Sequence, residues 1–177
     1  MKLKALAATL LAASTALPAQ AGIMEDHEFL WNAIGRVGVE RRINDPTECK
    51  DGYDGFYIQQ ASGPMMVICQ TNATKPYTQV AWTANDLDTL RHEAHHIVQD
   101  CAAGRINDLR TAPIFNKQEL ISFVRGSGYT NAQLQSIWNS YSHKSEAVQI
   151  REIEAFAVAR SVDARTIGNK VLEFCLH

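Results

Sequence analysis

Residues 83–104 read TANDLDTLRHEAHHIVQDCAAG and carry the start and stop signals of one long helix. Thr83, followed three residues later by Asp86, is a start of the capping-box type, and Gly104 supplies the usual end. One face of this helix is apolar and is formed by Leu87, Leu90, Ala94, Ile97, Val98 and Cys101. Because His92 and His96 project to roughly the opposite face, the helix is predicted to pack its back on a core and to present both histidines to a cleft.

The spacing of His92 and His96 predicts a metal site. Residues four apart lie on one face of a helix, so two imidazoles can reach one ion while Glu93 lies beside them. The alternative interpretation is a solvated, histidine-rich helical face that binds no metal. His95 stands three residues from His92 and is interpreted as a supporting neighbour of the site or as a surface residue.

A catalytic zinc ion usually takes three protein ligands and keeps one position for water, so a third ligand is expected downstream. In the helix predicted over residues 145–161, Glu154 falls within an apolar stripe, whereas Glu152 points away from it and is interpreted as a solvated carboxylate. A buried carboxylate is costly unless it is paired or coordinates a cation. Glu154 is therefore the predicted third ligand, and Glu146 is the reserve candidate for that position. The competing interpretation is an ion pair from Glu154 to Arg125, Arg151 or Arg160.

Together the two motifs resemble the gluzincin metallopeptidases. His-Glu-x-x-His on one helix is followed, after a spacer, by Glu-x-x-Ala-x-Ala, here residues 154–159. The resemblance implies that Glu154 completes a zinc site and that Glu93 is the general base of peptide-bond hydrolysis. It also implies a zincin-like fold, in which a sheet lies over the active-site helix and an edge strand, expected at Tyr77–Thr83, lines the substrate groove.

The chemistry of such a site assigns roles to three further side chains. Zinc lowers the pKa of a bound water and polarises the scissile carbonyl, while Glu93 is placed to remove the proton of that water. The developing oxyanion needs another donor, and the nearest candidates along the chain are Tyr141 and His143. Each has a simpler interpretation, Tyr141 as a core aromatic and His143 as a surface residue.

Two rival functions stay open at this point. One is a protein of the cell envelope that binds metal or a partner without turning over substrate, and the other is a helical domain that binds no metal. Glu93 separates the first rival from an enzyme, because a simple binding site needs no general base between its ligands.

The remaining periodic segments predict an α+β domain with a small three-stranded mixed sheet and five or six helices. A helix is expected over residues 26–42. Three short β-prone runs follow at Phe56–Gln60, Met65–Gln70 and Tyr77–Thr83, and Ser62-Gly63-Pro64 is the turn of a hairpin between the first two. The later helices are expected to start at Asn116 and Thr130 and to cover residues 145–161 and 164–175.

Residues 1–21 have the three parts of a secretory signal peptide. Lys2 and Lys4 precede the apolar run Ala5–Leu17, and Ala19-Gln20-Ala21 is a small-x-small cleavage site. The mature chain, residues 22–177, is expected to be one domain and a monomer without a membrane anchor, in the periplasm or secreted. Its formal net charge is −4, because removing Lys2 and Lys4 leaves 15 of the 17 basic residues against 19 acidic ones. This charge gives no support for a nucleic-acid partner, and a peptide or protein is the expected substrate.

The four cysteines all lie in the mature chain and predict two disulfides in an exported protein. The favoured pairs are Cys49 with Cys69, which joins neighbouring segments, and Cys101 with Cys175, which ties the last helix to the histidine helix. Free, buried thiols are the alternative.

Overall fold

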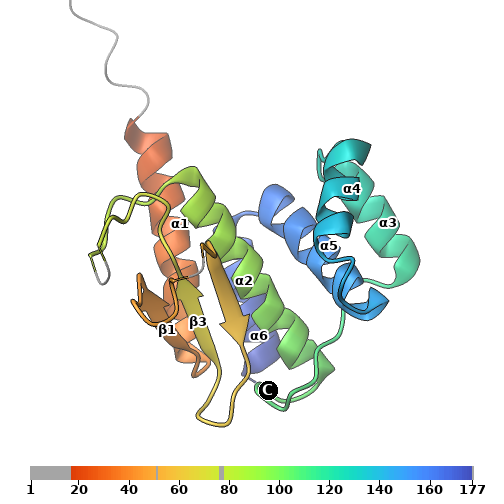
Figure 1. Cartoon of the computed structure of the whole chain (residues 1–177), viewed down its shortest axis with the longest axis horizontal. Coiled ribbons are helices and arrows are strands. Elements are labelled where there is room, and N and C mark those ends of the chain that lie inside the picture. Colours follow the sequence, from red (N-terminus) through yellow and green to blue (C-terminus); the bar gives the residue numbers. More distant parts are fainter. Residues whose placement is uncertain (1–16, 51, 76–77, 177) are drawn as a thin grey trace, which may run out of the picture.

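The computed structural model describes residues 17–50, 52–75 and 78–176, which form an α+β fold with six helices and one small sheet (Figure 1). The first 16 residues of the predicted signal peptide lie outside the described residues. Its last five residues lie within helix α1, Leu17–Arg36. Among the described residues, no helix is both long enough and apolar enough to cross a membrane.

The sheet has three strands in the order β1-β3-β2 and is mixed. β2 (Gly55–Ile58) and β3 (Met65–Ile68) form the predicted antiparallel hairpin, which is confirmed. β1 (Glu40–Ile43) runs parallel to β3. The prediction of a helix up to residue 42 is wrong at this end, because Gly38 takes a φ of 85° after α1 and the chain then enters the sheet.

The prediction of a strand at Tyr77–Thr83 is also wrong for its described part, residues 78–83, which form no ladder. Two side-chain amides bind this segment instead. Asn44 Nδ2 donates to the Thr78 carbonyl at 2.7 Å, and the Gln70 amide both donates to the Val80 carbonyl at 2.9 Å and accepts from its N–H at 3.0 Å. These amides satisfy the backbone groups that a neighbouring strand would have paired.

The remaining helices begin where their capping residues predict. Thr83, Asn116, Thr130, Ser145 and Asp163 each accept a hydrogen bond from a backbone N–H of the first turn of the helix that follows. The helices are α2 (Ala84–Ala103), α3 (Lys117–Gly126), α4 (Asn131–Ser140), α5 (Glu146–Ser161) and α6 (Ala164–Cys175).

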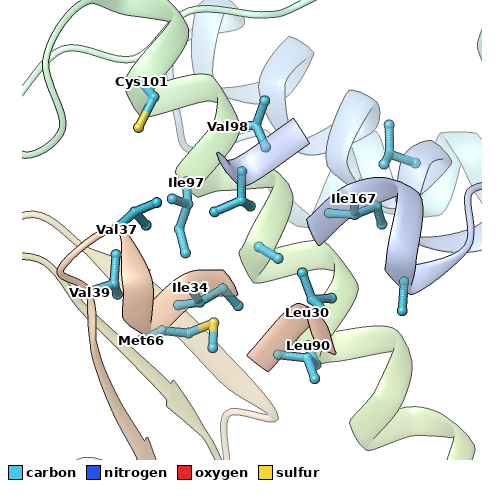
Figure 2. Packing of buried hydrophobic residues seen from close by; sticks show 14 of the residues in the cluster. Leu30, Ile34, Val37, Val39, Met66, Leu90, Ile97, Val98, Cys101 and Ile167 are labelled. Carbon is cyan, nitrogen blue, oxygen red and sulfur yellow. The ribbon is translucent and has the colours of Figure 1, made fainter. Parts of the chain in front are cut away.

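The main hydrophobic core lies where α2 meets α1, α6 and β3 (Figure 2). The apolar face predicted for α2 supplies Leu90, Ala94, Ile97, Val98 and Cys101 to this cluster. The other buried contributors labelled in Figure 2 are Leu30, Ile34, Val37, Val39, Met66 and Ile167. With its apolar face buried in this way, α2 turns its histidines toward α5.

A second, smaller cluster lies beyond α5. Leu120 and Val124 of α3 pack there against Ala157 of α5, with Ile150 and Ile153 at the margin. α5 therefore packs on two sides, against α2 on one and against α3 and α4 on the other, as its position in Figure 1 shows.

Both predicted disulfides are confirmed. Cys49 pairs with Cys69, and Cys101 at the end of α2 pairs with Cys175 at the end of α6. A further close approach occurs at Gly55, where a Cβ atom would lie 2.7 Å from both Thr89 Cγ2 and the Val67 carbonyl oxygen. Only glycine lets β2 lie this close to α2 one turn before His92.

Candidate metal centre

α2 brings His92, Glu93 and His96 together as the spacing predicts. One potential ligand atom from each of the three lies within 4.8 Å of the other two, so the group can hold a metal ion. His92 and Glu93 are buried, and the Nε2 atoms of His92 and His96 are 3.1 Å apart. The two ring nitrogens face each other, and a cation can bind between them.

A carboxylate from α5 completes this arrangement, and it belongs to Glu152. Its Oε2 atom lies 3.3 Å from His92 Nε2 and 3.5 Å from His96 Nε2. The prediction that Glu152 is a solvated carboxylate is therefore wrong, since only 15% of its side chain is exposed. His92 Nε2, His96 Nε2 and Glu152 Oε2 form a nearly equilateral triangle, the His–His–Glu triad.

The charges of the triad favour a bound cation. Burial opposes the ionisation of Glu152, yet its contacts with His92 and His96 hold its pKa well below the usual range. Burial also disfavours the charged form of His96, but the contacts with Glu152 and the nearby Glu93 carboxylate raise its pKa to about 9. Two carboxylates thus surround the imidazole pair, and positive charge is stabilised between them.

Glu154 lies elsewhere, on the other side of the contact between α2 and α5. Its carboxylate is fully buried and accepts hydrogen bonds from His95 Nε2 at 2.8 Å and from Gln99 Nε2 at 2.9 Å. It also accepts from the backbone N–H groups of Ile114 at 2.9 Å and Phe115 at 3.2 Å. This geometry speaks against the predicted role of Glu154 as third ligand, because its oxygens are already occupied by donors.

The other interpretations of these residues change accordingly. The partner of the Glu154 carboxylate is His95 rather than an arginine, so His95 is a buried residue and not a surface one. Burial lowers the pKa of His95 and outweighs the opposite effect of Glu154, so this imidazole is neutral and donates through Nε2. Glu146, the reserve ligand, is an exposed residue in the first turn of α5.

Comparisons with protein-family models, curated proteins and solved structures found no match. The chemistry of the centre therefore follows from its own residues.

Two residues of the centre were not predicted from the sequence. Glu152 was assigned to solvent, and Gln99, whose Oε1 lies 2.8 Å from His96 Nδ1, was not considered. The i, i+3 spacing of His96 and Gln99 on one helix is the signal that could have found the second.

A cleft with a volume of about 940 Å³ opens beside the triad. His92 and Glu93 line it from α2, and Phe156 lines it from α5 with its ring centroid 4.3 Å from that of His92. The predicted oxyanion donors Tyr141 and His143 both lie in its wall, Tyr141 half-buried and His143 exposed. Burial and the neighbouring Glu152 carboxylate raise the pKa of Tyr141, so its hydroxyl stays protonated and can donate.

Proposed function

We propose that this protein is an exported zinc metallopeptidase of gluzincin type, with His92, His96 and Glu152 as metal ligands and Glu93 as general base. The observation that carries the proposal is the shape of the His–His–Glu triad. Nitrogen or oxygen ligands about 2.0–2.1 Å from a tetrahedral zinc ion lie about 3.3 Å from one another. The three atoms of the triad are 3.1, 3.3 and 3.5 Å apart, so a zinc ion fits among them without rearrangement.

The donor set supports a catalytic rather than a structural role for the ion. Two histidines and one glutamate are three protein ligands, which leave a fourth position for water or substrate, and the cleft adjoins that position. When bound, zinc would supply an acidified water and an electrophile for the scissile carbonyl.

The protein's own residues then have separate tasks. Glu93 accepts the proton of the attacking water and passes it to the departing amine nitrogen, since it lines the cleft next to both histidines. Tyr141 donates a hydrogen bond to the carbonyl oxygen as negative charge develops there. The exposed side chain of His143 contacts the substrate at the rim of the cleft in this proposal and takes no part in the proton transfer.

An extended peptide is the substrate that suits this cleft. Among the described residues, β2 pairs with β3 alone, and its first residue, Gly55, lines the cleft. A free strand edge binds an extended peptide through backbone hydrogen bonds. The role that the resemblance gave to residues 77–83 thus passes to β2 in this proposal, which keeps the zincin-like arrangement of a sheet edge beside the active-site helix.

Export fits the covalent structure. Two disulfides form and persist in oxidising compartments such as the periplasm or the extracellular space. The signal-like residues 1–21 point to the same destination.

The test is to measure the zinc content and the peptide hydrolysis of residues 22–177 together with those of Glu93→Gln. The wild type is expected to hold about one zinc ion per chain and to cleave a mixed peptide library. Glu93→Gln should keep the zinc and lose about 10²–10⁴-fold in rate, which is the usual contribution of a general base. A wild type that binds zinc but cleaves nothing would support the rival metal-binding protein. A wild type that binds no zinc overturns the proposal altogether.

A further inference from the structure

We infer that Gln99 and Glu154 form a positioning pair that decides which nitrogen of His96 binds the metal. The inference rests on the proposed zinc site but concerns residues outside the triad. An imidazole has two nitrogens, and only the one without a proton can be a ligand. A hydrogen-bond acceptor that holds the proton of a histidine on the nitrogen facing away from the ion therefore favours metal binding by the other nitrogen.

The orientation of the Gln99 amide is fixed by two groups that can only accept. Gln99 Nε2 lies 3.1 Å from the Arg151 carbonyl oxygen and 2.9 Å from Glu154 Oε1. A carbonyl and a carboxylate have no proton to give, so the amide nitrogen must face them. The amide oxygen of Gln99 must then face the other way.

That oxygen lies 2.8 Å from His96 Nδ1. Since an amide oxygen only accepts, the Nδ1 atom of His96 carries the proton of this hydrogen bond. The lone pair of the neutral ring is therefore on Nε2, which is the atom that faces His92 and Glu152. Gln99 thus selects the tautomer of His96 that can bind a metal ion.

Glu154 holds the amide of Gln99 in this orientation. The carboxylate of Glu154 is fully buried and every group around it donates, namely His95 Nε2, Gln99 Nε2 and the N–H groups of Ile114 and Phe115. Only an ionised carboxylate, which accepts at both oxygens, satisfies four donors at once. The backbone of Gln99 is held in place as well, because its carbonyl oxygen accepts a hydrogen bond from the Ala112 N–H at 3.0 Å.

His92 is oriented by a different means. Its Nδ1 atom is buried and has no hydrogen-bond partner within the described part of the chain. Its ring packs instead on Phe156. Of the two proposed histidine ligands, only His96 is therefore expected to be affected by the loss of the positioning pair.

The experiment compares Glu154→Gln and Gln99→Met with the wild type in zinc affinity, measured by competition with a chromophoric chelator. Glu154→Gln places an amide N–H₂ among donors and frees Gln99 to turn over. Gln99→Met keeps the side-chain volume but replaces the amide oxygen with a weakly accepting sulfur, and it leaves three of the four donors on Glu154. Each variant should weaken zinc binding about 10–100-fold, the usual effect of losing the partner of a ligand.

A second readout excludes a merely structural role. In the zinc-loaded wild type, nitrogen-15 NMR of the histidine rings should show His96 ligated through Nε2, with an Nδ1 proton protected from exchange. Gln99→Met should lose that protection while the signals of His92 stay in place. The matched control is Gln70→Leu, which removes another buried amide, two residues after β3, and should lower stability without changing zinc affinity.

The outcomes separate the two proposals. If the wild type binds no zinc, the proposed function fails. If the wild type binds zinc and Gln99→Met binds it within twofold of the wild type, the positioning role is overturned, whatever Glu154→Gln does to folding. If the NMR spectra show His96 ligated through Nδ1, the argument from the amide orientation is overturned as well.

Discussion

Zinc binding is expected to depend steeply on pH, because a proton and a zinc ion compete for Nε2 of His96. The contacts with Glu152 and Glu93 raise the pKa of His96 to about 9 despite its burial. At pH 7, two units lower, about one molecule in a hundred has a neutral His96. The apparent zinc affinity at pH 7 should therefore be about 100-fold below its limit above pH 9, or about 2.7 kcal/mol weaker.

The assay is chelator competition at fixed total zinc from pH 6.5 to 8.5, corrected for the protonation of the chelator. The affinity should rise about tenfold per pH unit over this range, and calorimetry in buffers of different ionisation enthalpy should show about one proton released per zinc bound. An affinity that is constant over these two units would refute the reasoning. It would mean that Glu152 does not hold a proton on His96 in the metal-free protein.

The raised pKa of His96 makes the stability of the metal-free protein fall with rising pH, whereas the zinc affinity rises. A histidine with a pKa above its unfolded-state value of 6.5 stabilises the fold fully below that value, and the contribution is lost as the pH rises through about 9. The metal-free protein should therefore lose stability between pH 6.5 and 9, while the rise in melting temperature on adding zinc should grow. Melting curves at both pH values, with and without zinc, measure the two trends together.

Three further outcomes follow from single groups in the structure. Tyr141→Phe should lower kcat about 10²–10³-fold and leave the zinc content unchanged, as expected for an oxyanion donor; an unchanged kcat would return Tyr141 to a packing role. Asp86→Asn should cost about 1–2 kcal/mol in urea unfolding, because buried Asp86 accepts from Thr71 and Thr83 at the start of α2. Burial opposes the ionisation of Asp86, but these hydrogen bonds hold its pKa below 3.8. The wild type should therefore lose the stability that ionised Asp86 contributes only as the pH falls below that value. The Asp86→Asn variant should lack this acid-dependent loss. Replacing Cys101 and Cys175 together by serine opens a link across 74 positions of sequence and should cost about 2–5 kcal/mol, whereas a shift under 1 kcal/mol in the same assay would show that the ends of α2 and α6 hold together without it.

The histidine helix was predictable because its signals are local. A capping residue and the first backbone N–H groups of a helix lie within one turn, so Thr83 and Asp86 signal the start of α2 from the local sequence. The disulfides were predictable for a related reason, since the favoured pairs linked elements that had already been assigned. Sequence reasoning placed His92, Glu93 and His96 correctly relative to one another because one helix carries all three.

The third strand was not predictable in the same way. Residues 40–43 read Glu-Arg-Arg-Ile, which lacks the alternation of apolar and polar residues typical of a strand, and they become a strand by pairing with β3. Residues 78–83 have good β-propensity, but the amides of Asn44 and Gln70 occupy their backbone groups. In both places a distant partner overrides the local preference, as β-propensity commonly allows.

The choice between Glu152 and Glu154 depends on how α5 is rotated about its axis. The apolar stripe through Ile150, Ile153 and Ala157 was taken as the face toward the site, but it packs against α3 and α4. The face toward α2 is a different one. The carbonyls of Arg151 and Ala159 accept hydrogen bonds from side chains of α2, and Val158 packs in the main core beside that helix.

Residues two apart on a helix are about 200° apart around its axis, so Glu152 and Glu154 lie on the two flanks of this second face. On α2, His92 and His96 are four residues apart along one flank of the contact, and His95 and Gln99 are four apart along the other. Glu152 bridges the first pair and Glu154 bridges the second. The sequence contains both carboxylates and both pairs, but only the packing of α5 between two clusters decides which carboxylate meets His92 and His96 and which one meets His95 and Gln99.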